Sequence, residues 1–165
     1  MAAGPNDIEL IKGRMNFQTI GPDKLNHLRH AKVFNTTEKL FSHMKKHAEV
    51  LRPKFEAVLK MFDKEFGGLD IATWTKPKGG YFISLDMLCG SAKRVYGLCL
   101  DAGVKLTEAG ATYPYGKDPK DANLRIAPSY PPLSELKQAA QVLCLCVKLA
   151  AVEKALSAQG FFKSM

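Results

Sequence analysis

The longest pattern in the sequence is a run of apolar residues that recur every three or four positions from residue 40 to residue 66. This spacing predicts a helix of about thirty residues, roughly 45 Å long at the standard rise. Thr36 or Thr37 is expected to cap its start. Pro53 is expected to kink it by removing a backbone hydrogen bond, and the glycine pair 67–68 to end it. The stripe lacks the strict seven-residue repeat of a coiled coil, so we interpret the helix as a connector between two bodies.

The first third of the chain predicts two short helices with thin apolar faces. Asn6 or Asp7 is expected to cap the first, and Pro22 to occupy the first position of the second. The apolar positions of this region are Ile8, Ile11, Met15, Phe17, Ile20, Leu25 and Leu28. They are too few to form a core, so we expect them to pack on another part of a longer protein or on a partner, or to self-associate.

Three β-rich runs follow, at residues 81–85, 104–107 and 124–127, with a possible edge strand at 71–74. A last helix follows the third run and is expected to end at Gly160. The apolar face of that helix comprises Leu136, Ala140, Leu143, Val147, Ala151 and Ala155. The second half therefore predicts an α+β fold, a small antiparallel or mixed three-stranded sheet covered by helices on one face.

A helix capped by Ser91 and stopped by Gly103 separates the first two runs. The connection at residues 108–122, rich in glycine and proline, is long enough to suspect a functional loop. Tyr113 and Tyr115 lie in it. They are either side chains that close over a site or turn aromatics without a function.

The composition of the chain favours a compact globular protein over a membrane protein or a nucleic-acid-binding protein. The chain has 165 residues, 46% of them apolar, which suits one compact domain or a small domain with an appendage. No apolar run reaches the length of a membrane span, and the N-terminus shows no secretory signal pattern, so a cytoplasmic protein is expected. The net charge of +8 is mixed with acids along the chain and has no aromatic ladder, so nucleic-acid binding is not expected.

Neither the cysteines nor the histidines form a strong metal-binding pattern. The four cysteines are Cys89, Cys99, Cys144 and Cys146. None belongs to a Cys-x-x-Cys pair, and we interpret them as buried thiols. His43 and His47 lie four residues apart. His27 and His30 lie three apart. Such pairs can hold a metal, but no third ligand is evident, so surface histidines and no metal site are predicted.

Arg125 is a single charge among the apolar neighbours of the third β-rich run. An unpaired charge on a half-buried strand is very costly, so this guanidinium needs an anionic partner. A structural acid such as Glu108 or Asp86 is one candidate partner, and a bound anion is the other. Spacing by itself favours the structural acid.

Three segments in order resemble a known family. They are 77–82 (Pro-x-Gly-Gly-Tyr-Phe), 103–107 (Gly-Val-x-Leu-Thr) and 123–129 (Asn-Leu-Arg-Ile-Ala-Pro-Ser). Together they resemble the C-terminal domain of fold-type I, class I/II pyridoxal-phosphate-dependent aminotransferases, and most closely the bacterial aspartate aminotransferases. Residues 17–24 and the long helix resemble the end of that family's large domain and its interdomain helix.

The resemblance implies a division of the chain into three parts. Residues 1–35 would be a helical remnant of the large domain. Residues 36–68 would be the interdomain helix. Residues 69–165 would be the small α+β domain.

The resemblance also implies that Arg125 binds the α-carboxylate of the substrate, because a planar guanidinium fork matches a carboxylate as lysine cannot. It implies amino acid and 2-oxo acid substrates, and an upstream large domain and a homodimer as partners. Arg14 lies near the position of an arginine that, in relatives using dicarboxylates, reaches the neighbouring subunit's site and binds the side-chain carboxylate. A solvent-facing helix arginine is the alternative.

The family needs a lysine that forms a Schiff base with pyridoxal phosphate, in a segment of small residues. No lysine here has that context; Lys12 and Lys24 lie in helical patterns. The resemblance therefore places the catalytic lysine and the cofactor-binding residues in an upstream large domain, and predicts that this chain alone is inactive and binds no cofactor stably. The alternative is a stand-alone α+β binding or dimerisation module.

Overall fold

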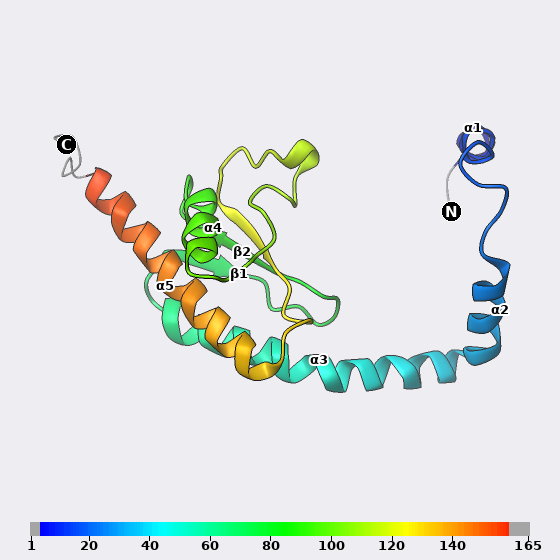
Figure 1. The fold of residues 1–165 in the computed structure, drawn as a ribbon, viewed down its shortest axis with the longest axis horizontal. Helices are drawn as coiled ribbons and strands as arrows, with labels where there is room; N and C mark the ends of the chain where they lie inside the picture. Colours follow the sequence, from blue (N-terminus) through cyan, green and yellow to red (C-terminus); the bar gives the residue numbers. More distant parts are fainter. Residues whose placement is uncertain (1–3, 159–165) are drawn as a thin grey trace. The chain divides into compact units, whose positions relative to one another are not determined.

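The computed structural model describes residues 4–158 of the chain. Its elements are α1 (Pro5–Met15), α2 (Lys24–Val33), α3 (Thr37–Phe66), β1 (Ala72–Trp74), β2 (Ile83–Met87), α4 (Ala92–Asp101), the 3-10 turn η1 (Pro114–Gly116), β3 (Asn123–Ile126) and α5 (Leu133–Ala158) (Figure 1). The chain divides into two compact units, Met1–His47 and Ala48–Met165, whose boundary falls within α3. The α+β class with a three-stranded sheet is confirmed. The predicted three-part division stays a prediction.

The first unit has no buried residue in α1 or α2. Between these helices, Phe17 and Ile20 are almost completely exposed to solvent. Leu25 and Leu28 on α2 are exposed as well. Residues 4–47 therefore lack a core of their own, as the thin apolar faces predicted.

The starts of the first two helices differ from the prediction. α1 begins at Pro5, ahead of the predicted caps at residues 6–7, because the fixed φ of proline suits the first helical position. α2 is capped by the Asp23 carboxylate, which accepts the N–H of Asn26 at 3.0 Å. Pro22 therefore precedes this helix instead of starting it.

The long helix α3 matches the predicted apolar stripe. Its first residue is Thr37, and the Thr36 hydroxyl accepts the N–H of Lys39 at 3.4 Å, so Thr36 is the cap. Pro53 lies inside the helix, and the kink expected there stays a prediction. The buried residues of α3 are Val58, Phe62 and Phe66. The helix ends before the glycine pair, where Gly68 adopts a φ of 76°.

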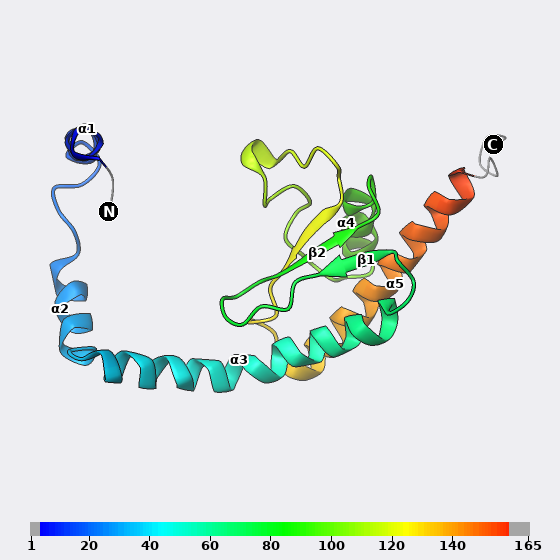
Figure 2. The same cartoon turned by 180° about the vertical axis from the view of Figure 1, so that it is seen from behind.

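The sheet is antiparallel with the order β1-β2-β3, so β1 is an edge strand, as predicted (Figures 1 and 2). Leu85 lies opposite Trp74 on one side and Leu124 on the other. Buried residues of β2 alternate with Ser84 and Asp86, so the sheet has one apolar and one polar face. The apolar face shares a single core with the second half of α3, with α4 and with α5.

The strand predicted at residues 104–107 is wrong, since the structure has no strand there. Val104 follows α4 closely, and its N–H donates to the carbonyl of Cys99 at 2.7 Å. Val104 and Leu106 pack against the core from this loop, so their burial needs no strand partner. β2 begins and ends two residues later along the chain than the predicted strand, because Met87 continues its buried alternation.

The last helix, α5, buries most of its predicted apolar face, but Ala155 is exposed. Its expected end at Gly160 lies outside the described residues. No helix between residues 4 and 158 is both long and apolar enough to cross a membrane.

Three of the four cysteines are buried, as predicted: Cys99, Cys144 and Cys146. Burial raises the pKa of the Cys99 and Cys144 thiols to about 12, so they remain protonated at neutral pH. Cys89 is exposed, contrary to the prediction. It lies in the turn between β2 and α4, where its thiol donates to the carbonyl of Lys120 at 3.1 Å.

An ion pair joins α3 to α5 at the edge of the core. Lys148 Nζ lies 2.6 Å from Glu65 Oε2, and both side chains are partly buried. The hydrogen bond from Lys148, followed by its positive charge, lowers the pKa of Glu65. A carboxyl group whose pKa is lower in the folded state stabilises the fold above its unfolded pKa and loses this effect as the pH falls.

We therefore expect Glu65→Gln to lower the free energy of unfolding at pH 7. The difference from the wild-type chain should shrink as the pH falls below about 4.3, the ordinary pKa of glutamate, and vanish once Glu65 is protonated in the folded state. Urea unfolding of both chains between pH 7 and pH 3 measures the difference. A difference that does not change with pH would contradict the role of this ion pair.

Candidate functional site

The polar face of the sheet carries four side chains from two neighbouring strands. Ser84 and Asp86 come from β2, and Asn123 and Arg125 from β3. The register pairs Ser84 with Arg125 and Asp86 with Asn123. Residues paired directly across antiparallel strands point to the same face, so these four groups lie together on the side away from the helices.

Arg125 has an apolar cover but no acidic partner. Its guanidinium carbon lies 4.4 Å from the centroid of the Phe82 ring, a cation–π arrangement. Its Nε is buried and has no hydrogen-bond partner among residues 4–158. The salt bridges of the same residues do not include Arg125, so the structural acids Glu108 and Asp86 do not fill the role that spacing favoured.

The carboxamide of Asn123 forms hydrogen bonds that link β3 to β2 and to the loop of residues 108–122. Asn123 is only 6% exposed. Its Nδ2 donates to Ser84 Oγ at 2.8 Å and to Asp86 Oδ1 at 2.9 Å. Its Oδ1 accepts the hydroxyl of Thr112 at 2.8 Å. These four residues and Tyr113 line a pocket of about 350 Å³.

The sequence pattern by itself did not single out Asn123. The available signal was an asparagine at the start of a strand, where this residue type is depleted unless its side chain has partners. Its burial with three hydrogen bonds explains why it is found there.

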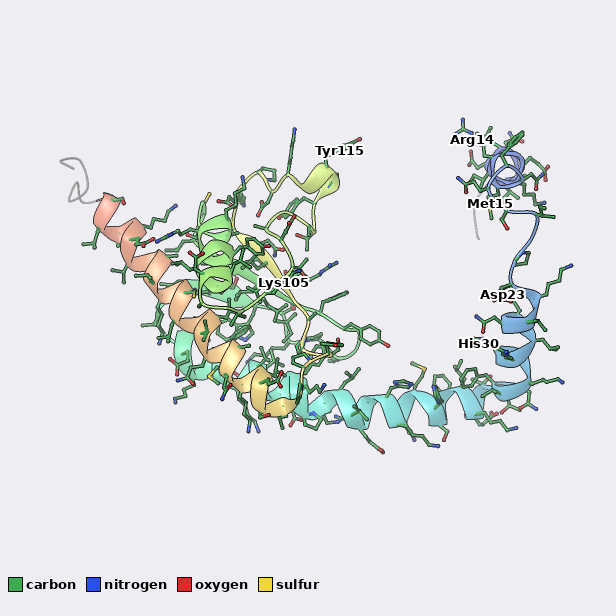
Figure 3. The ribbon with its side chains drawn as sticks, viewed as in Figure 1. Arg14, Met15, Asp23, His30, Lys105 and Tyr115 are labelled. Carbon is green, nitrogen blue, oxygen red and sulfur yellow. The ribbon has the colours of Figure 1, made fainter. Side chains whose placement is uncertain are left out.

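The loop of residues 108–122 is held closed by contacts within itself. Gly110, at a φ of +90°, approaches Gly116 so closely that a Cβ would clash with the carbonyl, so the loop closes on itself. In both Figure 1 and Figure 2, η1 and its loop lie across the sheet from the second half of α3. Figure 3 places Tyr115 at the tip of this loop, where it is 96% exposed, whereas Tyr113 lines the pocket.

Asp118 fixes the end of this loop next to β3. Its carboxylate accepts the N–H groups of Lys120, Ala122 and Asn123 at 2.8–2.9 Å. Burial by itself would raise the pKa of Asp118, but the backbone N–H donors together lower it. The charged carboxylate therefore stabilises the turn that leads into the site.

Arg14 is an exposed residue of α1, in the unit that does not contain Arg125 (Figure 3).

His30 is exposed on α2. His43 and His47 are exposed on α3, with their Nε2 atoms 3.0 Å apart. Among residues 4–158, no group of three His, Cys, Asp or Glu side chains is arranged to hold a metal ion.

The pocket does not have the donor set that pyridoxal phosphate needs. Its lining has no lysine for a Schiff base and no cation for the phosphate, and it carries the Asp86 carboxylate. Lys105, the lysine labelled in Figure 3, is exposed beside α4. The residues that line this pocket therefore do not form a cofactor site by themselves.

The chain matches the family profile described as aspartate amino-transferase over residues 1–159. An aspartate aminotransferase of Corynebacterium glutamicum is 47% identical over 141 residues, which are 86% of this chain and 33% of the relative. The solved structure of an aspartate transaminase from the same species superposes with a TM-score of 0.83 at 43% identity, covering 92% of this chain and 36% of that chain.

A structure of α-aminoadipate aminotransferase from Thermus thermophilus, complexed with N-(5'-phosphopyridoxyl)-L-leucine, has a TM-score of 0.72. Its sequence identity is 18% over 92% of this chain and 38% of that chain, so this likeness shows the fold alone.

The fold and the matches define this protein as an aminotransferase domain, of the α+β type that these enzymes use as their C-terminal domain. The chain belongs to the aspartate aminotransferase family. It spans about a third of the length of the relatives that it matches.

Proposed function

We propose that the chain acts within a longer aminotransferase, where Arg125 binds the α-carboxylate of the amino acid and of the 2-oxo acid. The observation that carries the proposal is Arg125 itself, covered by Phe82 on the open face of the sheet and free of any acidic partner among residues 4–158. A half-buried guanidinium that has no acidic partner within the described part of the chain suits a ligand carboxylate.

The geometry supports two parallel hydrogen bonds to that carboxylate. The Phe82 ring covers one face of the guanidinium, which restricts its rotation. A guanidinium held in one orientation presents its fork to both oxygens of a carboxylate with less loss of side-chain entropy. The role of this chain is thus to bind and orient the substrate.

The remaining parts of the enzyme are proposed from the relatives. Pyridoxal phosphate, held by an upstream large domain, would supply the electron sink for amino-group transfer. The substrates would be an amino acid and a 2-oxo acid, and the enzyme a homodimer. We propose Arg14 as the residue that reaches the neighbouring subunit's site for a side-chain carboxylate. The domain division of residues 1–35, 36–68 and 69–165 belongs to the same proposal.

A hybrid enzyme tests this function. In the hybrid, the chain replaces the matching 141-residue segment of the C. glutamicum aspartate aminotransferase. Transfer of the amino group from L-aspartate to a 2-oxo acid supports the proposal. A hybrid that folds and binds pyridoxal phosphate without this activity would favour the alternative, a stand-alone binding or dimerisation module.

The chain alone is expected to be inactive and to self-associate. Mixed with pyridoxal phosphate, it should give no Schiff-base band near about 410–430 nm that survives gel filtration, because no lysine lines its pocket. The exposed apolar side chains of its first unit should make its sedimentation depend on concentration. The active hybrid serves as the positive control for the band. A stable band with turnover would contradict the dependence on an upstream domain.

A further inference from the structure

We infer that Asn123 is a positioning residue, which holds residues 108–117 of the loop on the open face of the sheet so that Thr112 and Tyr113 form a wall of the pocket beside Arg125. The inference rests on the proposed function, because it concerns the pocket next to the proposed carboxylate site. Its first test is independent of any substrate.

The carboxamide of Asn123 is matched to its surroundings. A buried polar side chain is costly unless its donors and acceptors are used. Both Nδ2 hydrogens have acceptors on β2, at Ser84 and Asp86, and the carbonyl oxygen accepts the hydroxyl of Thr112. An isosteric aspartate would lose the two donors and set a second carboxylate beside Asp86. The amide is thus the group that this position requires.

The hydrogen bond between Thr112 and Asn123 is not duplicated by another hydrogen bond from residues 108–117 to the sheet, within the described part of the chain. Residues 108–117 otherwise make their hydrogen bonds among themselves, such as Tyr113 N–H to the carbonyl of Gly110 at 2.9 Å. Other bonds between this loop and the rest of its unit come from residues 118–122. Within the described part of the chain, the Thr112–Asn123 bond is therefore the hydrogen bond that attaches residues 108–117 to the sheet.

The position of Asn123 links this attachment to the proposed site. Asn123 and Arg125 are alternate residues of β3 on the same face, so their Cβ atoms are about 7 Å apart. The lining of the pocket includes Asn123, its partner Thr112 and the neighbouring Tyr113. A substrate bound at Arg125 would contact Thr112 and Tyr113. If the loop were not attached to the sheet, this contact would be lost.

Hydrogen exchange of the full chain tests the attachment. Thr112→Val removes the hydroxyl with little change in shape, and Thr112→Ser keeps it, so the two form a matched pair. We expect the amides of Tyr113 and Gly116 to exchange at least tenfold faster in Thr112→Val and in Asn123→Ala. They should exchange at the wild-type rate in Thr112→Ser, and the amides of α5 should be unchanged in all variants. Thr112 is exposed, so its variants remain informative if Asn123→Ala does not fold.

The hybrid enzyme tests the consequence for the site. Thr112→Val should raise the KM for L-aspartate about fivefold to tenfold while kcat stays near that of the parent hybrid, because the wall contacts the substrate but not the reacting atoms. Unchanged loop exchange in Thr112→Val, or faster exchange with an unchanged KM, would overturn the inference. Failure of the carboxylate proposal is recognised separately, by an Arg125→Ala hybrid with unaltered kinetics.

Discussion

Arg125→Ala in the hybrid enzyme is expected to lower kcat/KM roughly 30-fold to several-thousand-fold. This corresponds to a loss of about 2–5 kcal/mol of transition-state stabilisation. Most of the loss should appear as a higher KM for the amino acid. The variant leaves the substrate carboxylate without its charged partner, and the exposed face of Phe82 cannot replace it. Steady-state kinetics with L-aspartate over a range of concentrations gives both constants.

Two further variants sharpen this prediction. Arg125→Lys keeps the charge but loses the planar fork, so it should recover only part of the activity. Arg94→Ala is the matched control, since Arg94 pairs with Glu153 at 2.7 Å on the surface between α4 and α5. It should change kcat/KM little. Kinetics of Arg125→Ala equal to those of Arg94→Ala would remove Arg125 from the substrate site.

Phe62→Ala is expected to destabilise the chain by about 3–5 kcal/mol, the usual cost of truncating a buried aromatic residue. Phe62 is 0% exposed and stands where α3 meets the sheet. Its ring centroid lies 5.4 Å from that of Phe66 and 5.8 Å from that of Trp74. The truncation leaves a cavity and removes two aromatic contacts, each of which adds stability beyond the buried area.

Urea unfolding followed by far-ultraviolet circular dichroism measures this loss. Phe17→Ala is the matched control, because Phe17 is 94% exposed and should contribute within about 0.5 kcal/mol. A loss below about 1 kcal/mol for Phe62→Ala would mean that the core between α3 and the sheet repacks around the gap.

The period and the caps of the helices depend on residues that are close together in the sequence. The period of α3 and the cap at Thr36 were predictable, because both depend on residues three or four positions apart. The start of α2 was misplaced, although its signal is also local: Pro22 was expected at the first helical position, but the helix begins at Lys24. Asp23 is the cap, because its carboxylate accepts the backbone N–H of Asn26, a role that proline has no side-chain acceptor to fill.

The strands show where local pattern fails. Residues 104–107 have the composition of a strand, but the structure has no strand there. Ladder hydrogen bonds need a neighbour at the correct distance, and the sequence does not state which segments become neighbours. Tertiary packing instead places Val104 and Leu106 against the core directly after α4, where both are partly buried.

The candidate site divides in the same way. By itself, the sequence determined that Arg125 is a lone charge on a strand with an apolar alternation, since both features are local and the cost of an unpaired charge is general. Only the tertiary structure decided that Glu108 and Asp86 form no salt bridge with it, that Phe82 covers it, and that the Asn123 carboxamide is hydrogen-bonded to Asp86 and to Thr112 of the loop. The register of β2 against β3 and the closure of the loop set those distances, because they join residues far apart along the chain, such as Ser84 and Asn123, which are separated by 39 positions.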